Sequence, residues 1–378
     1  MPLTILTVAA LPFPTRQGTQ VLIGEICGEL ARRGHRVHLL CYAHRAFEER
    51  GALAYEVHRL PDFPRNRSVR SGPSVSKILL DVRLAAHARR LARAVRADVV
   101  HAHGHEAILA TALPPRIPLP IVHHAHTSMG PELPTYFEAR PLAGLARAAG
   151  EALDWVAPRL ADATAAVSLA LARACGGAHV PPAVRLPGPP ATAVPVEPRV
   201  VYAGNLDRYQ GLDALLAAVA SVDRAELVIV SASFPGPIAA RAAAVGIARR
   251  VRFVPHGDVE DVRRLLASAS VVVVPRGIPT GFPIKLLEAL GSAAPVIVSR
   301  RVAEGIVDGL EARVVDDDGL ADAIDEILSD PRGAREMGAR GRQWALAHHD
   351  PSRAADLLEE VFARAIRART HWSTGTNQ

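Results

Sequence analysis

Short apolar runs alternate with longer stretches of helical periodicity along most of the chain. In the first half these runs are LTILTVAAL, HRVHLLCYA, ADVVHAHG and LPIVHHAH, all rich in Val, Ile or Leu. Such runs, separated by helices, are typical of a parallel sheet that is covered on both faces. The first predicted helix, from about Thr19 to Arg33, stacks Leu22, Ile26 and Leu30 on one face, and Gly34 suits a left-handed cap behind it.

A proline-rich segment, VPPAVRLPGPPATAVPVEP at residues 180–198, separates this pattern from a second copy of it. The segment has neither helical nor strand periodicity and is predicted to be an interdomain linker. After it come the apolar runs PRVVYAGNL, AELVIVSAS, RVRFVPHG, ASVVVVPR and APVIVSR. We therefore predict an α/β protein with two doubly wound, Rossmann-like domains, 1–187 and 198–350, and a helix with a tail over 351–378. Ligands are expected at the carboxyl ends of the strands.

Length and composition fit this organisation. The chain has 378 residues, of which 49% are hydrophobic and 22% charged, which suffices for two packed cores. The opening MPLTILTVAALPFPT has no basic region and is interrupted by Pro12 and Pro14, so we expect a buried strand rather than a signal peptide. No stretch reaches the ~18 apolar residues of a spanning helix. Three widely spaced cysteines suit core positions in a reducing cytoplasm.

Positive charge is concentrated between Arg65 and Arg96, where nine cations face one acid, Asp81. Ile78, Val82, Leu84, Leu91 and Val95 recur there at helical spacing, which predicts a basic amphipathic helix. A solvated helix face in an arginine-rich protein is one interpretation; contact with anionic lipid or with a phosphorylated acceptor is another. Binding of nucleic acid is disfavoured because no aromatic residues lie between the arginines.

Two neighbouring strand ends carry six histidines. They are His101, His103 and His105 after one strand, and His123, His124 and His126 after the next. A metal site is disfavoured because no carboxylate or cysteine with ligand spacing completes the set, so no metal is expected. The polar lining of a pocket for a hydroxyl-rich ligand and ordinary hydrogen-bonded histidines are the two remaining interpretations.

The stretch PTGFPIKLLEALGSAAPVI contains one of only two lysines among 44 cationic residues. Pro283 suits the first position of a helix, which would direct the preceding amides at a ligand, and Lys285 and Glu288 would then share one helical face. A helix N-terminus with a lysine binds anions, and a carboxylate one turn later can hold ribose hydroxyls. The simpler alternative is an exposed salt bridge between the two side chains.

Taken together, these segments resemble the large retaining glycosyltransferase family 4, which has the GT-B fold. TGFPIKLLEALGSAAPVI resembles the family's signature of two carboxylates separated by seven residues. QGTQVLIGEICGELARRGHRVHLL, ADVVHAHG, VHHAHTSMGPELP, VVYAGNLDRYQGLDALLAAV, VRFVPHGDVEDVRRLLASASVVVVPR and EGIVDGLEARVVDDDGLADAIDEILSDP are similar to other parts of the family in the same order. The resemblance therefore covers nearly the whole chain.

The resemblance implies that a hexose moves from a nucleotide diphosphate sugar to a hydroxyl acceptor, with retention at the anomeric carbon and with neither a metal nor a cofactor. The donor would lie on the C-terminal domain, the acceptor on the N-terminal domain, and the last helix would return to the N-terminal domain. The implied catalytic residues are His126 and Thr280. The implied donor-binding residues are Gly18, Gly204, Asn205, Gln210, Val254, His256, Gly281, Phe282, Pro283, Ile284, Lys285 and Glu288. The acceptor-side candidates are Gln17, His103, His105 and Glu132.

Three positions depart from the family pattern. Thr280 stands where the first acid of the signature is expected, and Asn205 and Gln210 stand where the family usually has an arginine and a lysine that neutralise the diphosphate. We therefore predict that Lys285, with Arg208 or Arg276, replaces the missing cations, because an ammonium on a flexible stem suits a confined phosphate site.

These departures leave a second function open. A protein that keeps the GT-B fold and a nucleotide pocket but transfers nothing would tolerate all three of them. A GT-B-fold sugar-nucleotide epimerase is disfavoured because the C-terminal segment follows the transferase pattern. The acceptor, the base and the sugar are not specified by the sequence; glycolipid, polysaccharide or glycoside synthesis is expected, in the cytoplasm or at the inner membrane face.

Overall fold

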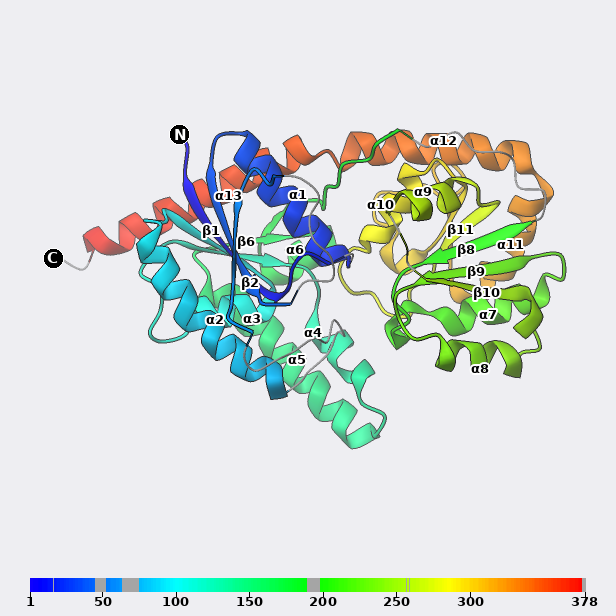
Figure 1. Cartoon of the computed structure of the whole chain (residues 1–378), viewed down its shortest axis with the longest axis horizontal. Coiled ribbons are helices and arrows are strands. Elements are labelled where there is room, and N and C mark those ends of the chain that lie inside the picture. The colour runs from blue at the N-terminus through cyan, green and yellow to red at the C-terminus, as the bar shows by residue number, and fades with distance from the viewer. Residues whose placement is uncertain are drawn as a thin grey trace. The chain divides into compact units, whose positions relative to one another are not determined.

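The computed structural model describes residues 1–15, 17–44, 52–62, 75–188, 198–255, 257 and 259–375, and it divides the chain into two compact units, each built around one sheet (Figure 1). Unit 1 comprises Met1–Val184, Thr280–Phe282 and Pro351–Gln378. Unit 2 comprises Arg185–Pro279 and Pro283–Asp350.

Unit 1 contains a seven-stranded sheet in the order β3-β2-β1-β4-β5-β6-β7, and every neighbouring pair is parallel. The strands are β1 (Thr4–Pro12), β2 (Arg36–Tyr42), β3 (Glu56–Arg59), β4 (Val99–His103), β5 (Ile121–Ala125), β6 (Ala163–Ala166) and β7 (Ala178–His179). The helices are α1 (Gly18–Arg32), α2 (Val75–Ala94), α3 (Gly104–Ala112), α4 (Met129–Glu132), α5 (Arg140–Leu160), α6 (Leu169–Cys175) and α13 (Pro351–Gly375).

Unit 2 contains a six-stranded parallel sheet in the order β10-β9-β8-β11-β12-β13. Its strands are β8 (Arg199–Ala203), β9 (Glu226–Ser231), β10 (Val251–Pro255), β11 (Val271–Val274), β12 (Val296–Ser299) and β13 (Arg313–Val315). Its helices are α7 (Leu212–Ser221), α8 (Gly236–Ala244), α9 (Val259–Ala267), α10 (Ile284–Gly291), α11 (Leu320–Ser329) and α12 (Pro331–His348). This strand order is that of a dinucleotide-binding Rossmann sheet, which confirms the predicted fold class.

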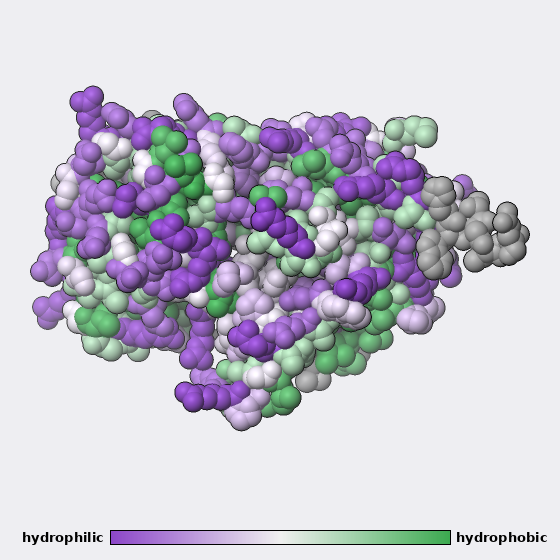
Figure 2. All heavy atoms as spheres, turned by 180° about the vertical axis from the view of Figure 1, so that it is seen from behind, coloured by the Kyte–Doolittle hydropathy of each residue, from purple (hydrophilic) through white to green (hydrophobic). Residues whose placement is uncertain are grey.

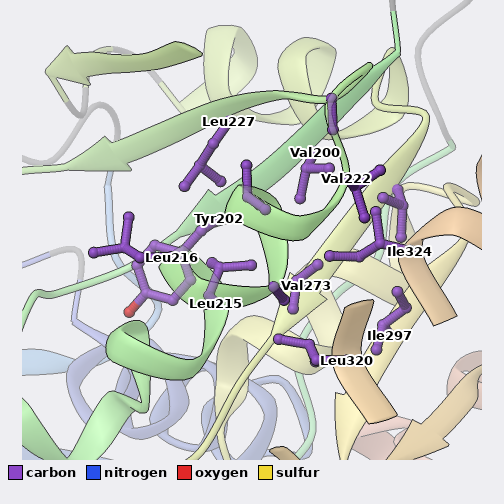
Figure 3. Close-up of a cluster of buried hydrophobic side chains, with 14 of the residues drawn as sticks. Val200, Tyr202, Leu215, Leu216, Val222, Leu227, Val273, Ile297, Leu320 and Ile324 are labelled. Atoms are coloured by element: carbon purple, nitrogen blue, oxygen red, sulfur yellow. The ribbon is translucent and has the colours of Figure 1, made fainter. Parts of the chain in front are cut away.

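The core of unit 2 is an aliphatic cluster in which Val200, Leu215 and Ile324 are fully buried. Tyr202 lies at one end of this cluster, and Figure 3 shows its hydroxyl oxygen directed away from the aliphatic side chains. Because a buried tyrosine hydroxyl needs a polar partner, the end of β8 must provide polar groups next to the core.

The last helix belongs to unit 1. Arg33, just after α1, donates from Nη1 to Oε1 of Glu359 on α13 over 2.7 Å and also pairs with Asp356. Leu358, Val361 and Phe362 of α13 are fully buried. The helix predicted within 351–378 is thus present as α13, and its apolar face packs in unit 1.

The basic segment gives a partly wrong prediction. Residues 63–74 lie outside the described residues. The predicted helix is present as α2, but the face that it buries differs from the predicted one. Leu84 faces the core together with Leu80, whereas Ile78 and Val82 are 64% and 65% exposed. The charged and apolar residues of α2 do not separate cleanly, so spacing alone assigned Ile78 and Val82 to the wrong face.

Candidate functional site

The switch point of the unit 2 sheet lies between β8 and β11. From β8 the chain adds strands in one direction, to β9 and β10, and from β11 it adds them in the other, to β12 and β13. Ligands of open parallel sheets bind at the carboxyl ends of the two strands where the order reverses. Gly204 follows β8 directly, and Arg276 comes two residues after β11, so both lie at this end of the sheet.

Lys285 is the centre of a polar network at this point. Its Nζ donates to the hydroxyl of Tyr202 over 2.9 Å and to Oε1 of Gln210 over 2.5 Å, and it lies 4.3 Å from the centre of the Tyr202 ring. Nη1 of the buried Arg276 donates to the same Gln210 oxygen over 3.4 Å. Two cations therefore donate to one neutral amide oxygen. A bound anion would stabilise this arrangement because it would offset the two positive charges.

Gln210 and Asn205 form the other side of this network. Nε2 of Gln210 donates to Oδ1 of Asn205 over 2.6 Å, and Nδ2 of Asn205 donates to the Tyr209 hydroxyl over 3.1 Å. The Tyr202 hydroxyl donates to the backbone oxygen of Asn205. The two positions where the resemblance leads one to expect cations are thus held together, and Lys285 reaches one of them from α10.

The electrostatics of Lys285 follow from this position. Burial lowers the pKa of Lys285 well below its ordinary value, and the charge of Arg276 lowers it further. Burial also raises the pKa of the Tyr202 hydroxyl. Burial and the charge of Arg276 both oppose a positive charge on Lys285. A negative ligand near Nζ would therefore raise the pKa of Lys285 again and would be bound more tightly by the charged form.

Helix α10 begins one residue later than predicted. Ile284 is its first residue, and Pro283 is the N-cap, with φ −78° and ψ 107°. Pro283 therefore precedes the helix instead of occupying its first position. The backbone of Pro283 is extended because the chain turns sharply there, after Gly281 at φ +56°.

Glu288 lies one turn after Lys285 on α10 and is open to water. Protein atoms crowded around the rest of the side chain raise the pKa of its carboxyl above the ordinary value, and the charge of Lys285 opposes that rise. Within the described chain, no ion pair joins the two side chains. The alternative of an exposed salt bridge is therefore wrong, and the carboxyl is accessible to a ligand.

In unit 1 the candidate histidines stack at the ends of β4 and β5. Nδ1 of His103 lies 2.9 Å from Nε2 of His126, and Nε2 of His101 lies 3.0 Å from Nδ1 of His124. Burial lowers the pKa of His101 and His123 to about 3 and that of His126 to about 4. His126 is consequently neutral near pH 7, where it can donate or accept a hydrogen bond but does not act as a charged acid.

The hydrogen bonds of these histidines do not use every ring nitrogen. Several buried ring nitrogens have no partner within the described part of the chain: Nδ1 of His101, Nε2 of His103, Nε2 of His124 and both nitrogens of His123. Ligand atoms of His101, His103 and His124 lie within 4.8 Å of one another. The absence of a metal here remains a prediction.

His105 has a different environment. Its Nε2 lies 2.9 Å from Oδ1 of Asp154 on α5, and Asp154 also accepts the backbone amides of Met129 and Gly130 over 2.8 Å and 2.9 Å. Asp154 therefore fixes the chain that follows β5. The sequence did not indicate it, because it lies within an amphipathic helix and matches no motif.

The remaining candidates occupy separate positions. Gln17 is the N-cap of α1, directly before Gly18, and its Oε1 accepts from Nε2 of Gln20 over 2.9 Å. Glu132 accepts from Thr127 Oγ1 over 2.6 Å and from the Tyr136 hydroxyl over 3.0 Å. Val254 is partly buried in β10, and His256 lies outside the described residues.

Residues Thr280–Phe282 cluster with unit 1. Thr280 is fully buried, and a Cβ added to Gly281 would lie 2.2 Å from the backbone oxygen of His126. Only glycine fits this approach at a positive φ. The structure thereby brings Gly281 to His126, two of the residues that the resemblance singles out.

Comparison with known families matches both halves of the chain. The family described as "Glycosyltransferase Family 4" matches residues 16–186, and the family described as "Glycosyl transferases group 1" matches residues 197–330. The chain belongs to glycosyltransferase family 4. The suspected resemblance is thereby confirmed.

Curated relatives of this family 4 chain match over part of their length. The GDP-mannose-dependent alpha-(1-6)-phosphatidylinositol monomannoside mannosyltransferase of Mycolicibacterium smegmatis is 30% identical over 214 residues, which are 49% of this chain and 56% of that protein. The chain spans about half the length of three of the curated relatives that it matches.

Solved structures extend the likeness to the whole fold. Sucrose-phosphate synthase from Thermosynechococcus elongatus has a TM-score of 0.82 at 19% identity and covers 97% of this chain and 100% of that one. HepE from Anabaena in complex with UDP-glucose has a TM-score of 0.72 at 16% identity, covering 96% and 99%. These likenesses confirm the GT-B fold of the family 4 chain.

None of the helices in the described ranges is long and apolar enough to cross a membrane. Figure 2 shows a face on which hydrophilic residues predominate and hydrophobic ones lie among them in small groups.

Proposed function

We propose that this chain is a retaining glycosyltransferase that moves a hexose from a nucleotide diphosphate sugar to a hydroxyl acceptor without a metal ion. The observation that carries the proposal is the convergence of Lys285 and Arg276 on Gln210 at the switch point of unit 2. These cations supply the positive charge that Asn205 and Gln210 cannot, and they do so where a Rossmann sheet binds phosphates.

Each candidate then has a role in the reaction. The Lys285 ammonium and the Arg276 guanidinium would hold the diphosphate and stabilise the charge that develops on it as the bond to the sugar breaks. Glu288 would accept hydrogen bonds from the ribose hydroxyls, and neutral His126 would bond a sugar hydroxyl. A phosphate oxygen of the leaving group would take the proton of the acceptor, so no carboxylate base is required.

The relatives support a nucleotide sugar as donor but differ in its base. The mannosyltransferase relative is named for GDP-mannose, and the HepE structure contains UDP-glucose. The base-binding side of this chain includes Val254, and the sugar would be held by the turn around Gly281 and Phe282. The donor base is therefore the first quantity to determine.

One observation favours the second candidate, a GT-B protein that binds a nucleotide without transfer. Thr280 is fully buried, so at the position of the first signature acid the protein has a hydroxyl that solvent does not reach and that carries no negative charge. An oxocarbenium-like centre would lack that charge. The alternative predicts nucleotide binding with no release of nucleotide from any nucleotide sugar.

The acceptor side is proposed to face an anionic or lipid-linked acceptor. On α2, Ile78, Leu79 and Val82 are 64%, 56% and 65% exposed, and this group lies in the most basic segment of the chain. An exposed apolar group with nearby cations suits the headgroup region of an anionic membrane. Flotation with vesicles containing phosphatidylglycerol at low salt tests this contact; a triple Ile78→Ser, Leu79→Ser, Val82→Ser variant should lose it.

Transfer is tested by incubating the protein with UDP-, GDP- and ADP-hexoses and measuring nucleotide release. Slow hydrolysis of one donor without acceptor would support the enzyme, and proton NMR of the released or transferred sugar would show whether its anomeric configuration is retained. Glu288→Gln should slow the reaction. The same rates after treatment with EDTA would support metal independence, and nucleotide binding without release from any donor would favour the second candidate.

A further inference from the structure

The edge of the unit 1 sheet carries a second cluster of titratable side chains, separate from the strand ends described above. His38 lies near the start of β2, and Glu56 and His58 lie on the edge strand β3. In the parallel register His38 is paired with Glu56, and alternate residues of a strand share a face, so all three side chains project from one face. No step of the proposed transfer uses them.

The ligand atoms of these side chains form a compact triangle. Nδ1 of His38 lies 3.2 Å from Nε2 of His58 and 3.4 Å from Oε2 of Glu56, and His58 Nε2 lies 3.6 Å from the same carboxylate oxygen. A tetrahedral zinc ion with bonds of ~2.0–2.1 Å holds its ligand atoms ~3.3–3.4 Å apart. The three atoms thus already approximate one face of a zinc coordination tetrahedron.

We propose that His38, Glu56 and His58 bind a zinc ion, with water in the fourth position. Two imidazoles and one carboxylate are a ligand set that zinc uses in proteins. The site is reachable, because the Glu56 side chain is 68% exposed and that of His58 is 32% exposed, while His38 is buried and fixed by β2. The ion would link the edge strand β3 to β2. Zinc binding at this site is independent of the proposed glycosyl transfer.

The other histidine cluster is the less suitable one. His101, His103 and His124 are all buried, and the group of ligand atoms that they form contains no carboxylate. A divalent ion there would lose its hydration without an anionic ligand to offset the charge. At the sheet edge, Glu56 supplies one negative charge and water still reaches the site.

One neighbouring charge acts against the ion. Arg36 lies two residues before His38 on β2, and its positive charge acts on the His38 ring. Replacing Arg36 by serine should therefore tighten zinc binding, because like charges repel over short distances. This is a change that mere damage to the site would not produce.

The test is isothermal titration of zinc chloride into the full chain, freed of any histidine tag and of metal. We expect one zinc per chain from this site. Glu56→Gln and His58→Ala should each weaken binding by more than the ~10-fold that loss of an outer-shell partner costs. His348→Ala, a change of an exposed histidine on α12, should leave binding unaltered.

Cobalt(II) absorption supplies the second readout, since a tetrahedral site gives intense visible bands that Glu56→Gln should abolish. The proposal is overturned if the wild-type chain shows no saturable binding of zinc. It is equally overturned if both site variants bind zinc as tightly as the wild type, because the ion then lies elsewhere. Circular dichroism of each variant shows whether it is folded, and both substituted side chains are partly exposed.

Discussion

Acidification should destabilise unit 1 through its buried histidines. An unfolded histidine titrates at a pKa near 6.5, whereas burial lowers the pKa to about 3 for His101 and His123 and to about 4 for His126. As the pH falls below 6.5, the unfolded state therefore binds more protons than the folded state does. Stability is at its full value above pH 6.5 and is lost as the pH falls from there towards the folded values.

The magnitude follows from these limits. Between pH 7.5 and 5.5 each such histidine costs about 1 kcal/mol of stability, so the three together cost roughly 3–4 kcal/mol, a large part of the stability of an ordinary domain. Two further buried histidines, His103 and His124, whose pKa values are also lowered by burial, add to this cost. Carboxylates with shifted pKa values contribute as well, so a variant is required to isolate the imidazoles.

His123→Leu is that variant, because neither ring nitrogen of His123 has a hydrogen-bond partner within the described part of the chain. Hydrogen exchange of peptides from β4 and β5 at several urea concentrations gives the free energy of opening at each pH. The loss between pH 7.5 and 5.5 should be about 1 kcal/mol smaller in His123→Leu than in the wild type and unchanged in His348→Gln. An equal loss in wild type and His123→Leu would refute the reasoning.

Three further changes test other parts of the structure. Gly281→Ala should lower the melting temperature by several degrees more than Gly309→Ala, because both glycines have positive φ but only at Gly281 would the new Cβ meet a backbone oxygen; equal melting temperatures would contradict this. Asp154→Ala should cost ~2–3 kcal/mol in urea unfolding, because His105 and two amides lose their acceptor, whereas Glu151→Ala, exposed on the same helix, should be near neutral. Burial raises the pKa of the Cys27 thiol to about 12, so Cys27 should resist alkylation at pH 8 in the folded protein, whereas the partly exposed Cys175 should react. Equal labelling of the two cysteines in mass spectrometry would exclude this burial.

Much of the fold was predictable because most of its strands are apolar and largely buried. Continuous apolar runs such as VVVV at Val271–Val274 leave few alternatives, and every strand predicted from such a run is present. The missed strands lack that signal. β3 reads EVHR, β6 reads ATAA, β13 has three residues and β7 has two, so their pairing is fixed by neighbouring strands rather than by their own composition.

The candidate site was predictable in part for a similar reason. Lys285 stands out in the sequence because it is a lysine among arginines. The missing cations at positions 205 and 210 predict that another cation, such as Arg276, replaces them. The contacts themselves were not predictable, since Tyr202 and Gln210 lie 83 and 75 residues from Lys285 and meet it only through the fold. Asp154 was missed because it matches no motif, and the group of His38, Glu56 and His58 was missed because His38 lies on β2 whereas the other two lie on β3.

The central claim is that Lys285 holds the donor diphosphate, and Lys285→Met tests it most directly. Removing a charge-assisted hydrogen bond to phosphate costs ~1.5–3 kcal/mol, or about 10- to 150-fold in affinity. The substitution also removes the hydrogen bonds of Lys285 to Tyr202 and Gln210, so the melting temperature without ligand serves to show that the variant is folded. Isothermal titration with UDP, GDP and ADP should therefore show one nucleotide that binds the wild type and binds Lys285→Met at least tenfold more weakly. Unchanged affinity in a folded variant would contradict the account.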